Sequence, residues 1–446
     1  MILPFYMVCN YMYYYKVRIA NSDDCFPFYN IVEHNVIDML HFRFLQGLYS
    51  IPPIAMNVLG ADVKWIAVCY AFVYSVPVLF TMYLLYRTSW RYFVYFMLSF
   101  TFFISYQYYF SISEYWLGGC IYFILYMLMD RGMPIGAKGR WLHVILLLLT
   151  VNLHLSLFYP TVVMLLYLFL KAKLDMKTTG IYLVVCFLYL LLKLTFLTTE
   201  YESDILTDNN QLSLADNYLN TRVIREFFLH SWDWLYPAVV LAFIAYSVFK
   251  GQIEYHKSIL LSIFVIVPLF VVALMFKNFP YFFYVIGNLR VLLLFLPILF
   301  VDFCPKKLYK PIVILLIIHA IFSIESIGIT LKKRYDNIAE LLTATKENTV
   351  YVYDDPVCLV HFKYIFMQTM TINLLENDKN NYISFINPKT DNIDYLKHDL
   401  VKYQSISKKE YKNRFTEYKM QKLSETRYAI YDFLIDRNVR ECILDR

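Results

Sequence analysis

Long apolar runs separated by short polar loops dominate the first three quarters of the chain. Most runs hold about twenty residues, the length that an α-helix needs to cross a hydrocarbon core of roughly 30 Å. The pattern therefore predicts a mainly α fold, a polytopic membrane bundle of about eleven spans. The predicted spans are 1–15, 65–86, 92–110, 115–129, two short spans within 141–170, 181–198, 235–249, 259–275, 281–301 and 311–329.

Two of these runs have unusual lengths. The run 141–170 has no Lys, Arg, Asp or Glu, and NLHLSLFYP interrupts it, so we expect two short spans that turn near His154. The run 1–15 is short for a span. It is either a short span or the end of a helix whose start is missing, and the lack of a preceding basic segment disfavours a signal peptide.

Basic residues gather in alternate loops, which predicts the orientation. Loops rich in Lys and Arg stay in the cytoplasm. At least two such residues occur in each of RTSWR, DRGMPIGAKGR, KAKLDMK, KGQIEYHK and CPKKLYK. The opposite loops, together with the tail, are then predicted to be extracytoplasmic. The expected location is a bacterial inner membrane, as a multi-pass integral protein.

Two further segments have their own patterns. Apolar residues at helical spacing over 31–48 predict one amphipathic helix in the membrane interface, ended by Pro52-Pro53. After Leu331 the composition shifts, and 332–446 is expected to form a small soluble extracytoplasmic α+β domain behind the transmembrane region 1–331. Within it, KENTVYVYDDP and NYISFINP predict strands.

Composition agrees with a membrane protein. The chain of 446 residues is 59% hydrophobic and 17% charged, whereas soluble domains are about one quarter charged. The net charge of +6 does not indicate nucleic-acid binding, because the cations sit in short loops where they set orientation. The eight cysteines show no metal-binding spacing.

An acidic pair in the first extracytoplasmic loop is the leading candidate for chemistry. Asp23 and Asp24 stand in ANSDDCFPFYN, directly after the first apolar run. Ionisable groups near a bilayer are costly and often mark the working site. One of the two could act as a general base toward an acceptor hydroxyl, and the other could bind or orient. The alternative is that the pair only caps the following helix.

Further candidates lie on the same predicted side. Glu114 is the only charge between Tyr92 and Met129, at a turn; it could face the acidic pair, or it could be an ordinary headgroup-level residue. Two facing acids could hold a divalent cation. Donors for a phosphate group would come from His154, Arg222, Arg225, Lys277 and Arg290. His154 could instead be structural, and Arg290 could snorkel to the interface.

The order of these features resembles the GT-C superfamily of integral-membrane glycosyltransferases. The shared features are an acidic pair (NSDD) in an early loop, an interfacial helix, a second acid at Glu114 and an extracytoplasmic C-terminal domain. The resemblance implies sugar transfer from a polyprenyl-phosphate-linked donor to a glycan or lipid acceptor, without nucleic acid. Asp23 or Asp24 would then be the base, Glu114 would support it, and basic residues would hold the phosphate.

Two other functions stay open. The run from Tyr108 to Leu170 also resembles O-antigen and exopolysaccharide polymerases, but Ser113-Glu114 stand where those proteins carry an Arg, and they usually lack such a C-terminal domain. The second of these is a non-enzymatic function as a lipid or solute transporter. Against it, the chain has no inverted repeat and no paired Gly/Pro-broken spans.

Overall fold

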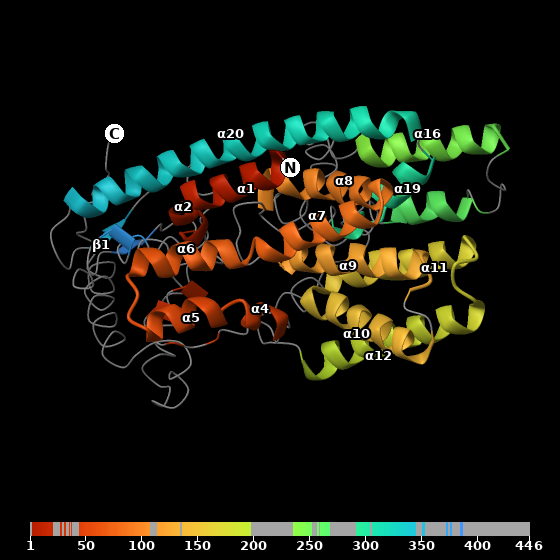
Figure 1. The fold of residues 1–446 in the computed structure, drawn as a ribbon, viewed down its shortest axis with the longest axis horizontal. Helices are drawn as coiled ribbons and strands as arrows, with labels where there is room; N and C mark the ends of the chain where they lie inside the picture. Colours follow the sequence, from red (N-terminus) through yellow and green to blue (C-terminus); the bar gives the residue numbers. More distant parts are fainter. Residues whose placement is uncertain are drawn as a thin grey trace, which may run out of the picture.

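The computed structural model is a bundle of α-helices that lie roughly along one long axis (Figure 1). Apart from a few isolated positions, the structure describes residues 2–20, 27–28, 31–32, 44–107, 114–133, 136–197, 235–251, 259–267, 291–303, 306–344, 350–352, 375–376 and 384–386. The mainly α class that the apolar runs predict is therefore confirmed, while the count of about eleven spans stays a prediction.

The described helices follow the apolar runs. In chain order they are α1 (Ile2–Tyr13), α2 (Tyr15–Ile19), α4 (Phe44–Leu48), α5 (Ile51–Val58), α6 (Val63–Val73), α7 (Val76–Thr88), α8 (Trp90–Gln107), α9 (Glu114–Asp130), α10 (Ala137–Leu153), η2 (Leu155–Leu157), α11 (Phe158–Leu170), α12 (Met176–Phe196), α16 (Leu235–Phe249), α19 (Leu296–Phe303), η4 (Lys306–Leu308) and α20 (Tyr309–Ala344).

Three described stretches are long and apolar enough to cross a membrane. They are Val63–Thr88, Met176–Phe196 and Tyr309–Lys333. Shorter apolar helices accompany them at Tyr115–Asp130, Gly139–Leu153 and Leu155–Leu170. Helices of this length and composition are compatible with a membrane protein.

The outward faces of these helices are apolar as well. Val184, Phe187 and Leu188 of α12 are each more than half exposed, and so are Leu315 and Phe322 of α20. A soluble protein rarely leaves such contiguous apolar surface uncovered. Lipid chains would cover it without cost, so the exposed side chains agree with the apolar composition.

The helix α20 lies along one side of the bundle, next to α1 and α8 (Figure 1). Helix α1 packs against both α6 and α20, and its residues Leu3, Met7 and Tyr11 are buried. The short first apolar run is thus a packed helix of the bundle. On the other side, α9 packs against α10, and α12 packs against α10 and α11.

The expected single helix over 31–48 is wrong. Asn35 has a positive φ of 55°, and residue 37 is not helical. Asn is among the few residues that tolerate the left-handed conformation. The Asn57 amide fixes this turn, because its Nδ2 donates to the Ile31 carbonyl at 2.9 Å, the Val32 carbonyl at 2.7 Å and Asn35 Oδ1 at 2.9 Å.

Pro52-Pro53, expected to end that helix, instead occupy the first turn of α5. The first turn has no intrahelical partner for its N–H groups, so proline is tolerated there and its fixed φ suits the helix. Helix α5 then packs against α6.

The break predicted near His154 is confirmed. Helix α10 ends at Leu153, His154 is extended (φ −157°, ψ 136°), and η2 and α11 follow. The structure also has a break that the sequence did not predict. The run 281–301, expected as one span, contains a turn at 293–295 before α19. Helix α20 also continues to Ala344, beyond the residue-331 end of the predicted transmembrane region.

Two short strands form where the C-terminal pattern predicts them. Strand β1 (Val350–Val352) pairs in parallel with β2 (Ser384–Ile386), with Tyr351 opposite Phe385. The remainder of 345–446 lies almost entirely outside the described residues, so the α+β domain stays a prediction.

Tyrosines fill much of the core. Tyr70, Tyr95, Tyr122, Tyr126 and Tyr182 are among the largest fully buried side chains. A buried hydroxyl needs a hydrogen-bond partner. The Tyr122 hydroxyl donates to the Pro160 carbonyl at 3.2 Å, which joins α9 to α11.

The close approach of α9 to η2 depends on Gly118. A Cβ at Gly118 would lie 2.2 Å from Cδ1 of the buried Leu157, whereas a Cβ at Gly119 would meet nothing within 4 Å. We expect Gly118→Ala to destabilise the protein by about 1–3 kcal/mol through overpacking. Gly119→Ala is the matched control and should be neutral or slightly stabilising. Thermal unfolding of the purified variants in detergent measures both, and equal midpoints would contradict the contact.

Candidate functional site

Most of the residues that the sequence singles out lie outside the described part of the chain. Asp23, Asp24, Arg222, Arg225, Lys277 and Arg290 are all in this group. Glu114 is the first residue of α9, but its side chain is also outside the described set. His154 is described in full. The predicted catalytic roles of the acids and the predicted phosphate-binding roles of the cations therefore stay predictions.

His154 joins the helix break to the start of α9. Its Nδ1 accepts a hydrogen bond from the Ser156 backbone N–H at 3.1 Å, which caps η2. Its Nε2 lies 3.1 Å from the Tyr115 hydroxyl, and the two rings are 4.4 Å apart. A neutral imidazole that accepts at Nδ1 carries its proton on Nε2. His154 therefore donates to Tyr115, the residue directly after Glu114.

A buried lysine lies at the same break. Lys193 of α12 is 1% exposed, and its ammonium group donates to the Asn152 carbonyl at 2.7 Å. A cation at the last carbonyls of a helix interacts favourably with the helix dipole. The Asn152 amide in turn donates to the Tyr189 hydroxyl at 2.6 Å. Lys193 is not among the candidates predicted from the sequence, although a single charge inside the apolar run 181–198 is a signal that could have identified it.

We call Tyr115, Asn152, His154, Tyr189 and Lys193 the break cluster. These residues come from α9, the α10–η2 junction and α12. The break cluster gathers an imidazole, an ammonium group and two phenols within a few helix turns of Glu114. Such groups can bind an anion or hold a proton.

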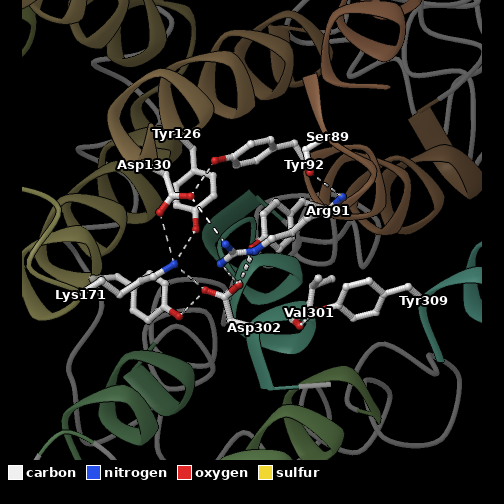
Figure 2. A network of polar contacts seen from close by, with 11 residues as sticks. Ser89, Arg91, Tyr92, Tyr126, Asp130, Lys171, Val301, Asp302 and Tyr309 are labelled. Atoms are coloured by element: carbon white, nitrogen blue, oxygen red, sulfur yellow. Dashed lines mark hydrogen bonds and ion pairs between the residues drawn. The ribbon is translucent and has the colours of Figure 1, made fainter. Parts of the chain in front are cut away.

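A second polar cluster, drawn in Figure 2, is formed by residues at the opposite ends of the helices, where the loops are predicted to be cytoplasmic. We call Arg91, Asp130, Lys171 and Asp302 the ion cluster. Its two carboxylates are nearly buried, with side chains 4% and 7% exposed for Asp130 and Asp302. The two cations and the two carboxylates bring the net charge to zero. Charges this buried are retained in proteins only when they are paired and hydrogen-bonded.

Asp302 is the centre of the ion cluster. Its Oδ1 accepts hydrogen bonds from the Arg91 guanidinium and from the Tyr95 hydroxyl, and the distance from Arg91 Nε to this Oδ1 is 3.1 Å. Its Oδ2 accepts from the Lys171 ammonium at 2.9 Å and from the Tyr167 hydroxyl at 2.6 Å. Helices α8, α11 and α19 thus meet at one carboxylate (Figure 2).

Asp130 brings α9 into the same cluster. Its Oδ1 lies 3.3 Å from Lys171 Nζ, and its Oδ2 accepts from the Tyr92 hydroxyl at 2.7 Å. Arg91 Nη1 lies 3.8 Å from the same Oδ2. Asp302 therefore has its acceptor sites filled, and Asp130 is 4% exposed and paired with Lys171. We interpret the ion cluster as a tie between helix ends.

One carboxylate in the predicted cytoplasmic loops has a clear capping role. Asp175 precedes α12, and its Oδ1 accepts from the Thr178 backbone N–H at 2.8 Å while its Oδ2 accepts from the Thr178 hydroxyl at 2.8 Å. These bonds favour the ionised form and hold the pKa of Asp175 below its ordinary value. The cap fixes where the candidate span Met176–Phe196 begins.

Within the described ranges, no group of three or more His, Cys, Asp or Glu side chains could hold a metal ion. The predicted site for a divalent cation involves Asp23, Asp24 and Glu114, whose side chains are outside those ranges, so it stays a prediction.

The comparisons with known proteins bring no match. No protein-family model matches the chain, and neither does any curated protein or solved structure.

Removing one member of the ion cluster should leave an excess buried charge. We expect Lys171→Met to destabilise the protein by about 3–5 kcal/mol, because two carboxylates then share one cation. Adding Asp130→Asn restores neutrality and should recover part of the loss. Lys173→Met is the control, because Lys173 is exposed in the same loop. Thermal unfolding in detergent tests the series, and a Lys171→Met variant as stable as the control would exclude the tie.

Proposed function

We propose that the protein is a membrane glycosyltransferase, which moves a sugar from a polyprenyl-phosphate carrier to a glycan or lipid acceptor on the extracytoplasmic face. The proposal rests on the acidic pair Asp23-Asp24 in an early loop and on the predicted sidedness of that loop. The helical fold and the three candidate membrane spans are compatible with such an enzyme.

The single structural observation that supports a shared site is the contact between Tyr115 and His154 at 3.1 Å. It brings the start of α9, where Glu114 lies, against the break between α10 and α11. Two residues that the sequence selects independently, 40 positions apart, are therefore neighbours in the fold. Both belong to the side on which Asp23 and Asp24 are predicted.

In the proposed reaction, Asp23 or Asp24 removes the proton from an acceptor hydroxyl. The oxygen then forms a bond to the anomeric carbon of the donor sugar, and the bond from that carbon to the phosphate oxygen breaks. Attack from the face opposite the leaving group inverts the anomeric configuration. The carboxylate keeps the proton, and the polyprenyl phosphate leaves with the electron pair.

The leaving phosphate needs positive charge close to its oxygens. We propose that Arg222, Arg225, Lys277 and Arg290 supply it, with His154 as a neutral donor at the helix break. Lys193 adds an ammonium group buried beside this break. Glu114 would orient the acceptor, or it would join the acidic pair in holding a divalent cation.

The base assignment predicts a specific loss of activity. Asp23→Asn and Asp24→Asn keep the size of the side chain but remove the base, which contributes typically about 10²–10⁴-fold. We expect one single variant, and the double variant, to lose transfer by that factor while carrier binding is retained. Glu114→Gln should give an intermediate loss. The assay uses synthetic polyprenyl-phosphate sugars in liposomes and measures sugar transferred and polyprenyl phosphate released.

Asp336→Asn is the matched control, because Asp336 is an exposed acid of α20 that pairs with Lys332 and is remote in sequence from every proposed site residue. Transfer at the parental rate by the double Asp variant would remove the acidic pair from the mechanism. Polymerisation of lipid-linked repeat units, without transfer of single sugars, would favour a polysaccharide polymerase. Lipid or solute movement without bond cleavage would favour a transporter.

The proposed orientation predicts which cysteines a membrane-impermeant maleimide can reach. Ser405→Cys lies in the tail and should be labelled from outside intact spheroplasts. Lys173→Cys lies in the basic loop KAKLDMK and should be labelled only after permeabilisation. Both are made in a background whose eight native cysteines are replaced. The reverse pattern would place the acidic pair in the cytoplasm and overturn the proposed extracytoplasmic reaction.

A further inference from the structure

One face of α7 is exposed and almost entirely apolar. Val76, Phe80 and Tyr83 are 45%, 57% and 62% exposed. The exposed Arg87 follows them at the end of the helix that is predicted to be cytoplasmic. Their spacing of four, three and four residues places all four side chains on the same side of an α-helix. We call Val76, Phe80, Tyr83 and Arg87 the α7 stripe.

The opposite face of α7 packs into the bundle. Its buried residues are Val78, Thr81, Met82 and Leu85. Helix α7 contacts α8 and α9. The helix therefore divides into one side that faces the protein and one side that the protein leaves exposed. A contiguous apolar surface of this kind is normally covered by a partner or by a membrane.

The length of the α7 stripe matches one leaflet of a bilayer. Arg87 follows Val76 by eleven residues, which is roughly 16 Å along the helix at 1.5 Å per residue. Half of a hydrocarbon core of about 30 Å is roughly 15 Å. Helix α7 is also the half of the candidate span Val63–Thr88 that adjoins the basic loop RTSWR. Arg87 is therefore at the level of the lipid headgroups when Val76 is near the middle of the bilayer.

Aromatic side chains indicate the same depth for this end of α7. Tyr86 and Trp90 stand on either side of the turn between α7 and α8, both are exposed, and their ring centroids are 5.9 Å apart. The Phe93 ring lies 5.5 Å from the Tyr86 ring and 5.4 Å from the Trp90 ring. Tyrosine and tryptophan are enriched where the hydrocarbon core meets the headgroups, because their rings are partly polar.

Arg87 differs from the neighbouring Arg91 in its partners. The Arg91 guanidinium is bound by Asp302 and belongs to the ion cluster. Among the residues that the structure describes, no ion pair or side-chain hydrogen bond includes Arg87. Its guanidinium is exposed and keeps its five N–H donors. Arg87 is therefore available for an anion from outside the protein.

The other charges on this face favour a negatively charged ligand. In the described parts of the predicted cytoplasmic loops, Asp130 and Asp302 are paired within the ion cluster, and Asp175 caps α12. The remaining exposed charges there are all positive, and they are Arg131, Arg140, Lys173, Lys177, Lys250, Lys307 and Lys310. Such an excess attracts an anionic headgroup and repels the ammonium group of a zwitterionic one.

We propose that the α7 stripe binds one anionic phospholipid of the cytoplasmic leaflet, with its phosphate at Arg87 and an acyl chain along the three apolar side chains. An arginine guanidinium can donate two parallel N–H bonds to phosphate oxygens. Tyr86 and Trp90 flank the headgroup at the turn between the helices. This proposal is independent of the glycosyltransferase proposal.

The test titrates phosphatidylglycerol or phosphatidylcholine into the full-length protein in detergent and counts bound lipids by native mass spectrometry. The wild type should bind the first phosphatidylglycerol more tightly than the first phosphatidylcholine. Arg87→Gln should weaken this binding about fivefold, because one surface cation is lost, and Arg87→Lys should restore part of it. Lys173→Gln is the matched control. It removes the same charge from the same predicted face, but Lys173 lies in a loop between helices, so binding should stay like that of the wild type.

Three results would overturn the proposal. The first is wild-type protein that binds phosphatidylcholine as tightly as phosphatidylglycerol, a measurement that does not depend on any variant folding. The second is an Arg87→Gln variant, monodisperse on size exclusion, that binds phosphatidylglycerol as tightly as the Lys173→Gln control. The third is displacement of the lipid by an equal concentration of inorganic phosphate, which would mean that the apolar side chains of the α7 stripe add nothing.

Discussion

The arrangement of the helices in the bundle depends on the hydrogen bonds and ion pairs of the Asp302 carboxylate. Helices that lie in lipid gain little from apolar contact with one another, because lipid chains are equally apolar. Polar contacts and close packing must therefore select which helices become neighbours. Asp302 accepts from Arg91, Lys171 and the hydroxyls of two tyrosines, and so it joins residues of α8, α11 and α19. Asp130 adds α9 through the same lysine.

Buried tyrosines form further polar contacts between helices throughout the interior. A tyrosine fills space like a phenylalanine but also carries one hydroxyl that must be satisfied. In this chain the buried hydroxyls join elements that are distant in sequence, as Tyr122 does with Pro160 and Tyr6 with Glu325. The 42 tyrosines of the sequence thus supply many of the directional contacts of a largely apolar molecule.

Local features of the fold could be predicted from the sequence. Helical segments and the break at His154 depend on runs of neighbouring side chains, and those runs can be read directly from the amino-acid sequence. The left-handed turn at Asn35 was not predicted from the sequence, because it depends on Asn57, which is 22 residues away. The run 31–48 has helical spacing on both sides of that turn, so periodicity alone could not reveal it.

The polar clusters were harder to predict for the same reason. Arg91 and Asp302 are 211 positions apart, and each lies in or beside a basic loop that by itself indicates only orientation. Lys193 and Glu325 are single charges within apolar runs and could have been selected on that ground. Of the candidate site, only the proximity of His154 to the start of α9 is visible, since the acidic pair lies outside the described residues.

The length of α20 has a mechanical consequence. Its 36 residues form one uninterrupted rod of roughly 54 Å, well beyond the hydrocarbon thickness of a membrane. Its first turns follow η4 next to the ion cluster, while Tyr335 near its other end donates to Glu376 at 2.8 Å. A stiff rod converts a small angular change at one end into a larger displacement at the other. A tilt of about 5° would shift the far end by roughly 5 Å, so a small movement beside the ion cluster would be amplified at the Tyr335–Glu376 contact.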